Sequence, residues 1–156
     1  MLAIELEKNA VKGFMGKLLR EDVLDSFEAR SVEILQRNRV TIDGMIENSI
    51  DSESEDIQTK RNFSTWGELR PMVYDIIRSG NKPSLVKIVF SHGNPSGTHP
   101  NAAALFLNMV YENDEVTFTT AASQKEFALS KAVDDIWDDS VRQFFLKAGI
   151  IVKDRI

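Results

Sequence analysis

Residues 103–149, AALFLNMVYENDEVTFTTAASQKEFALSKAVDDIWDDSVRQFFLKAG, decide the fold of this chain. In the last third of this stretch, apolar residues recur every three or four positions, which predicts one amphipathic helix. Ser130 is placed to cap its N-terminus and Gly149 to follow it as the C′ residue, with Asp134 and Asp135 near the positive end of the helix dipole. The predicted apolar stripe consists of Val133, Ile136, Trp137, Val141, Phe144, Phe145 and Ala148.

The residues before this helix predict a meander of strands for it to cover. Residues 104–111 are apolar on nearly both faces, as in a central strand, and residues 116–120 alternate and are rich in β-branched side chains. The polar residues 112–115 between them predict a turn, so the two strands form a hairpin. A second turn at 123–124 is expected to lead into a third strand at 125–129.

The N-terminal part predicts a strand, a helix and a second hairpin. Residues 2–6 alternate as a short strand, and Asn9 is expected to cap a helix. Residues 27–46 are predicted to form a hairpin with its turn at 37–38. Residues 47–62 are acidic and serine-rich with little to bury, which predicts a mobile loop. The helix after Asn9 has the apolar stripe Val11, Phe14, Met15, Leu18 and Leu19.

A further helix and strand connect the two halves. Thr65 and Glu68 have the spacing of a capping box, and Trp66 opens the apolar stripe of the helix that follows. Pro71 falls inside this helix, so a kink or a restart is expected there. Residues 85–90 predict a buried strand.

The predicted order is β-α-β-β, loop, α-β-β-β-β-α, and the fold class is α+β, with three helices covering an antiparallel sheet. A length of 156 residues fits a single domain spanning 1–156. A helix followed by antiparallel strands occurs twice, which suggests duplicated halves.

Composition and charge narrow the function classes. The chain has no cysteine, which excludes disulfides and thiolate metal sites and favours a reducing compartment. It shows neither a signal peptide nor an apolar run long enough to span a bilayer, so a cytoplasmic protein without membrane contact is expected. The formal net charge of −5 argues against general nucleic-acid binding.

Four strings in the chain are distinctive: TIDG at 41–44, WGELRP at 66–71, KIVF at 87–90 and WDDSVRQFF at 137–145. In these strings the chain resembles an uncharacterised family, a domain of unknown function, of small proteins from clostridia-like Gram-positive bacteria. The resemblance spans nearly the whole chain and implies a cytoplasmic bacterial protein, with no activity, ligand or site residues to carry over. The order of elements is also similar, at the level of fold alone, to DNA sliding-clamp domains.

The loop 91–101 is the most suggestive candidate site. It holds both histidines of the chain among hydroxyls and glycines, so it could bind a small ligand, an anion or a metal. Two histidines seven residues apart match no metal-ligand spacing, however, and the loop contains neither a nucleophile elbow nor a phosphate loop. A long hairpin connection is the structural alternative. The candidate ligand-binding residues are His92, Asn94, Ser96 and His99.

Other charged and aromatic residues have ordinary structural explanations. Four aspartates around Trp137 could bind a cation or a partner, or form a solvated helix face. The basic face of the first helix could meet phosphate if the clamp likeness held. Trp66 and Trp137 are expected to be core residues. The aspartates are Asp134, Asp135, Asp138 and Asp139, and the basic face consists of Lys8, Lys12, Lys17 and Arg20.

Three functional hypotheses remain. No catalytic set can be assembled, so we predict no catalytic residue and no cofactor, and favour a non-enzymatic protein that acts through protein–protein contacts or self-association. The first alternative is a small-ligand or metal-binding module that uses the 91–101 loop. The second is a clamp-like nucleic-acid accessory factor.

Overall fold

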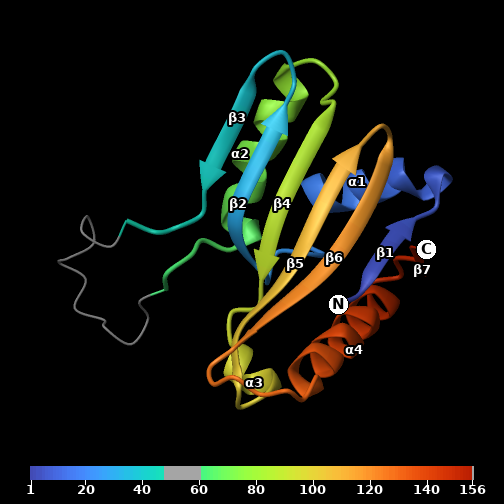
Figure 1. The fold of residues 1–156 in the computed structure, drawn as a ribbon. Coiled ribbons are helices and arrows are strands. Elements are labelled where there is room, and N and C mark those ends of the chain that lie inside the picture. The colour runs from blue at the N-terminus through green and yellow to red at the C-terminus, as the bar shows by residue number, and fades with distance from the viewer. Residues whose placement is uncertain (48–60, 156) are drawn as a thin grey trace.

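A computed structural model describes residues 1–47 and 61–155 of the chain. One seven-stranded antiparallel sheet has the order β3-β2-β4-β5-β6-β1-β7 (Figure 1). Three long helices and the one-turn helix α3 accompany it, so the predicted α+β class is confirmed. The strands are β1 (Ala3–Leu6), β2 (Glu28–Leu35), β3 (Arg39–Asp43), β4 (Leu85–Ser91), β5 (Ala102–Glu112), β6 (Glu115–Gln124) and β7 (Val152–Asp154). The helices are α1 (Val11–Arg20), α2 (Trp66–Ser79), α3 (Pro95–Thr98) and α4 (Ala132–Lys147), with a 3-10 turn at Lys8–Ala10.

The core lies between one face of the sheet and the three long helices. Phe118 of β6 contacts the ring of Phe14 from α1 and that of Phe145 from α4. Phe90 of β4 contacts the ring of Trp66 from α2. The three helices therefore share one apolar layer, and burying these rings is the main favourable term in folding.

The β5–β6 hairpin forms the centre of the sheet, as predicted. Its two-residue turn places Asn113 and Asp114 at φ 54° and 59°, a left-handed conformation that these residue types tolerate. The predicted third strand at 125–129 is wrong, because β6 continues to Gln124 and β1 occupies its other edge. The three-residue strand β7 then pairs with β1 and was not predicted.

The long C-terminal helix is confirmed as α4. Val133, Trp137, Val141 and Phe145 are buried along it, as the spacing predicts, and Phe144 and Ala148 are partly buried. Ile136, which was predicted to belong to the same stripe, is instead 38 % exposed. Its N-cap is Lys131 rather than Ser130, whose hydroxyl accepts a hydrogen bond from the Ala132 N–H instead.

A Schellman motif ends α4, as the position of Gly149 predicted. The Ile150 N–H donates to the Phe145 carbonyl at 2.9 Å and the Gly149 N–H to the Leu146 carbonyl at 3.2 Å. Gly149 has φ 72°, the left-handed conformation that this motif requires.

The N-terminal predictions hold with two exceptions. The cap of α1 is Ala10, without a side-chain hydrogen bond, because the 3-10 turn precedes the helix where Asn9 was expected to cap it. Helix α2 runs unbroken through Pro71, so of the predicted kink or restart the restart is wrong. The predicted loop at 47–62 falls largely outside the described residues. None of the helices in the described residues has the length and hydropathy needed to cross a bilayer.

The capping box at the start of α2 is confirmed. The Thr65 hydroxyl accepts from the Glu68 N–H at 3.3 Å, and the Glu68 carboxylate accepts from the Thr65 N–H at 3.0 Å. Arg61 also donates to this carboxylate. The hydrogen bond from Arg61, with that from the Thr65 backbone, lowers the pKa of Glu68 from its ordinary 4.5 to about 2.

We expect Glu68→Gln to remove a pH-dependent part of the stability while keeping the cap, since glutamine also suits this position. The folded-state pKa is lowered, so the stabilisation is complete above pH 4.5 and is lost as the pH falls towards 2. Glu68 is half exposed, so solvent screening limits the effect to about 0.5 kcal/mol near pH 7. Urea unfolding between pH 7 and pH 2 should show the two proteins converging, and a constant difference would contradict this.

Candidate functional site

A cavity of about 460 Å³ opens between α4 and the residues that precede β2 and follow β4. Its walls are mainly apolar and aromatic, with two hydroxyls, an imidazole and an amide among them. We call it the aromatic pocket. It is lined by Ser26, Phe27, His92, Gly93, Asn94, Trp137, Ser140, Val141 and Phe144.

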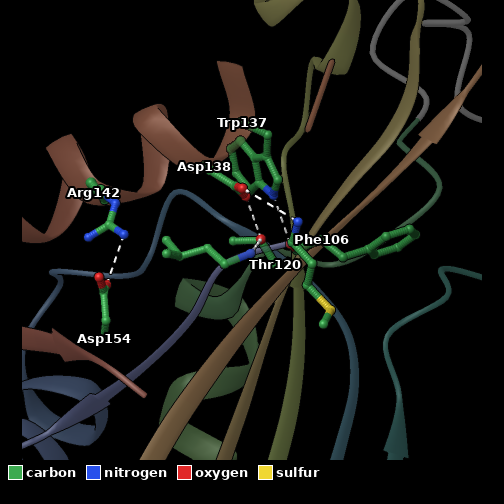
Figure 2. A network of polar contacts seen from close by, with 8 residues as sticks. Phe106, Thr120, Trp137, Asp138, Arg142 and Asp154 are labelled. Carbon is green, nitrogen blue, oxygen red and sulfur yellow. Dashed lines mark hydrogen bonds and ion pairs between the residues drawn. The ribbon is translucent and has the colours of Figure 1, made fainter. Parts of the chain in front are cut away.

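Trp137 and His92 are each fixed by the central strand β5. The Trp137 indole Nε1 donates to the Phe106 carbonyl at 2.8 Å, as Figure 2 shows, and the His92 N–H donates to the Leu105 carbonyl at 3.0 Å. The two rings meet edge to face, with centroids 5.9 Å apart. Strand β5 therefore fixes the positions of Trp137 and His92, which together form this wall of the pocket.

The structure divides the four residues predicted from the 91–101 loop. His92 and Asn94 line the aromatic pocket, and the Asn94 N–H donates to His92 Nδ1 at 2.9 Å. Ser96 and His99 do not line it. The His99 Nδ1 instead accepts from the Asn101 N–H, and the Ser96 hydroxyl accepts from Lys125 Nζ at 2.7 Å.

A metal centre has no support in the parts of the chain that the structure describes. Residues 1–47 and 61–155 contain no group of three or more histidine, aspartate, glutamate or cysteine side chains placed to hold an ion. Both Nδ1 atoms of the loop histidines are also engaged by backbone N–H groups. What the loop contributes is therefore one wall of the aromatic pocket.

Residues 125–131, the apolar segment, connect β6 to α4 and are irregular yet well held. Asn101 donates through its amide to the Glu126 carbonyl at 2.9 Å, and its side-chain oxygen accepts from the Glu126 N–H at 3.0 Å. Gln124 makes an analogous pair, accepting from the Ala128 N–H at 3.0 Å and donating to the Ser130 carbonyl at 3.3 Å. The segment's conformation is thus set by four side-chain to backbone hydrogen bonds.

This held segment displays two large apolar side chains to solvent. Phe127 is 88 % exposed and Leu129 is 89 % exposed, the highest values among large apolar residues in the described parts of the chain. The sequence predicts a strand here, entered through a turn at 123–124. Apolar residues within a polar stretch can belong to a strand or can lie exposed on the surface. Here the strand is excluded because β1 occupies the edge of β6 with which it would have paired.

A buried polar network joins α4 to the sheet beside the pocket (Figure 2). The Thr120 hydroxyl is buried, donates to Asp138 at 2.5 Å and accepts from the Leu2 N–H at 2.8 Å. Farther along the helix, Arg142 pairs with Asp154 of β7 at 2.8 Å. Asp138 and Asp154 therefore hold structure together, and the acidic helix face predicted around Trp137 is partly engaged in these contacts.

Ser91 is also buried, and its hydroxyl likewise makes structural contacts. It donates to the Glu28 carboxylate at 3.0 Å and accepts from Arg30 Nε at 2.9 Å. The Arg30 guanidinium lies 3.9 Å from the centroid of Phe63 and 5.1 Å from that of Phe106. These contacts link β2, β4 and β5 and use the hydroxyl fully, as buried polar groups require.

Comparison with known proteins places the chain in a family. Residues 17–153 match a family of unknown function (DUF5721). No curated protein and no solved structure matches the chain, so the likeness to sliding-clamp domains stays a prediction from element order. The match covers most of the chain and confirms the resemblance to an uncharacterised family. The chain belongs to DUF5721, a family of unknown function.

Proposed function

We propose that the protein acts through protein–protein contacts and self-associates through the apolar segment. The observation that carries this proposal is the nearly complete exposure of Phe127 and Leu129 on a segment held by hydrogen bonds. Burying a Phe or Leu side chain is worth about 1.5–3 kcal/mol, so leaving both in water forgoes a large stabilisation. A partner that covers them recovers it.

The fixed conformation of the segment favours this role. Side chains on a segment that is already ordered lose less entropy on binding than side chains on one that orders with its partner. Asn101 and Gln124 fix the backbone on both sides of Phe127, so the anchor is preorganised. Aromatic residues presented in this way are frequent hot spots of interfaces.

The aromatic pocket is the surface that best fits Phe127 and Leu129 from a second copy. Its walls are apolar and aromatic, with Phe27, Trp137 and Phe144 among them, and its volume of about 460 Å³ accommodates a large side chain. The apolar segment and the aromatic pocket of a chain both adjoin α4. Two copies can therefore exchange segments reciprocally about a two-fold axis, which closes the assembly as a dimer.

We expect the double variant Phe127→Ser, Leu129→Ser to weaken the dimer by at least about 30-fold, which corresponds to about 2 kcal/mol for the loss of a hot spot. Sedimentation velocity over a concentration series gives the dissociation constants. Both side chains are exposed, so the monomer fold should remain intact, and circular dichroism checks this.

The matched control is the double variant Leu146→Ser, Ile151→Ser. These side chains are also strongly exposed, but they line a different cavity that shares no lining residue with the aromatic pocket. The control should dimerise like the wild type. Equal weakening by both double variants, or a wild type that stays monomeric at 100 µM, would contradict the proposal.

A small-ligand role is the second candidate, because His92 and Asn94 place polar groups beside the aromatic ring of Trp137 in the same pocket. Ligand sites combine apolar walls with a few polar groups in this way. A monomeric wild type that retains a small molecule in native mass spectrometry would favour this function over self-association.

We also propose that the protein works in the reducing cytoplasm of a bacterium. The absence of cysteine supports the compartment, and the resemblance of the four sequence strings supports the source. A chain without thiols needs no oxidising environment to fold.

A further inference from the structure

A second cavity, of about 520 Å³, lies between α1, the C-terminal end of α2 and the β5–β6 turn. It is separate from the aromatic pocket and shares no lining residue with it. We call it the lysine pocket. It is lined by Lys8, Val11, Lys12, Met15, Leu19, Ile77, Lys82, Pro83, Tyr111 and Asp114.

The floor and walls of the lysine pocket are apolar. Val11, Met15 and Leu19 present the inner stripe of α1, and Ile77 and Pro83 close the side formed by α2 and its connection to β4. The ring of the buried Tyr111 lines the wall on the sheet side. A ligand in this cavity therefore meets mostly hydrocarbon below its rim.

The rim carries an excess of positive charge in a chain whose net charge is −5. Lys82 pairs with Asp114 at 2.5 Å. Lys8 lies 4.0 Å from Glu115, a residue that does not line the cavity. Among the described residues, the side-chain ammonium of Lys12 has no hydrogen-bond or ion-pair partner. The ammonium group that remains for a ligand is therefore that of Lys12, with Lys8 beside it in a loose pair.

Asp114 offsets the charge of Lys82, with which it pairs, and leaves the charges of Lys8 and Lys12 in excess. Tyr111 donates its hydroxyl to Asp114 at 3.1 Å, and the hydrogen bond from Lys82 lowers the pKa of Asp114. The same hydrogen bond raises the pKa of Lys82, while burial raises that of Tyr111. Near neutral pH the carboxylate is thus ionised, paired and held at the edge of the cavity.

We propose that the lysine pocket binds a small amphipathic anion, with the apolar part against α1 and the anionic head at Lys12 and Lys8. Apolar walls that end in a few convergent charged groups are the usual form of such a site. A carboxylate and a phosphate monoester share this chemistry, because both accept hydrogen bonds from ammonium groups.

Isothermal titration calorimetry with octanoate and octyl phosphate tests the site, with octanol as the neutral counterpart of equal chain length. We expect at least one anion to bind tenfold or more tightly than octanol, and the tighter anion identifies the head group. Lys12→Glu should weaken binding of that anion about fivefold or more, because it replaces an attraction by a repulsion.

Lys17→Glu is the matched control. It makes the same charge change on the same helix, but Lys17 lines a different cavity, near Gly149 and Ile150. Its affinity for the anion should stay within twofold of the wild type. The proposal is overturned if octanol binds as tightly as the anions, if neither anion binds at 10 mM, or if both lysine variants weaken binding equally.

Discussion

Replacing Trp66 with alanine is expected to lower the free energy of unfolding by at least about 4 kcal/mol, the typical cost of removing a buried aromatic side chain. Trp66 is fully buried and packs edge to face on Phe90 of β4, with centroids 5.8 Å apart. Its indole Nε1 donates to the Leu18 carbonyl of α1 at 3.0 Å. One side chain thus joins α1, α2 and the sheet, and its loss opens a cavity at their junction.

Urea unfolding followed by circular dichroism measures this change without relying on tryptophan fluorescence. Trp66→Phe should lose less, about 1–3 kcal/mol, since it keeps a ring in the core and leaves the Leu18 carbonyl without its donor. A typical domain has only about 5–15 kcal/mol in total, so the alanine variant should be close to unfolding at 37 °C. A loss below about 1 kcal/mol would show that Trp66 is not the junction described.

Gly44→Ala is expected to destabilise the protein by about 2–3 kcal/mol or more, since it forces an added atom into packed backbone. A Cβ on Gly44 would lie 1.7 Å from the carbonyl oxygen of Ala29. The Gly44 N–H donates to the Arg30 carbonyl at 2.9 Å, and its carbonyl accepts from the Ser64 N–H at 2.8 Å. Because both the N–H and the carbonyl of Gly44 are hydrogen-bonded, moving this backbone away from Ala29 would break these bonds.

Gly13→Ala is the matched control, and its effect should have the opposite sign. A Cβ on Gly13 meets nothing within 4 Å, and the residue lies inside α1, where alanine gains about 0.5–1 kcal/mol over glycine. Thermal unfolding of both variants compares the two changes directly. A Gly44→Ala protein as stable as the wild type would contradict the close approach of the two backbone segments.

The sequence predicts those elements whose signals are local. The helix α4, the capping box of α2 and the β5–β6 hairpin each depend on residues a few positions apart, and all three are confirmed. The failed strand at 125–129 depended instead on which segment pairs with the free edge of β6. That edge is taken by β1, which is more than a hundred residues away in the chain.

The candidate site was partly predictable for the same reason. The loop 91–101 drew attention through its histidines, and two of its four predicted residues do line a pocket. The other walls come from α4 and from Ser26 and Phe27, which only tertiary packing brings to the loop. No spacing in the sequence could separate His92 from His99, because each binds its own local backbone N–H.

Gly44 illustrates a second limit of prediction from the sequence. Its string TIDG contributed to the family resemblance, but a glycine after a strand is an ordinary turn residue in sequence. The structure shows why it must be small: β2 has an irregular register between Ala29 and Ser31, and Gly44 pairs with the backbone there. Close approach of two backbones leaves no local signal besides the glycine itself.

Cysteine cross-linking tests most directly whether the apolar segment of one copy enters the aromatic pocket of another. The chain contains no cysteine, so single cysteines can be placed without interference. Ala128→Cys lies between the two exposed apolar side chains and keeps both, and Ser26→Cys lies at the pocket. Ser79→Cys, an exposed position at the end of α2, serves as the control.

We expect the Ala128→Cys protein, mixed with the Ser26→Cys protein under mild oxidation, to form a disulfide-linked dimer that contains one chain of each. The same mixture with Ser79→Cys should form far less of the mixed dimer. Equal yields with both partners, or no mixed dimer at concentrations where the wild type sediments as a dimer, would show that the segment does not occupy this pocket.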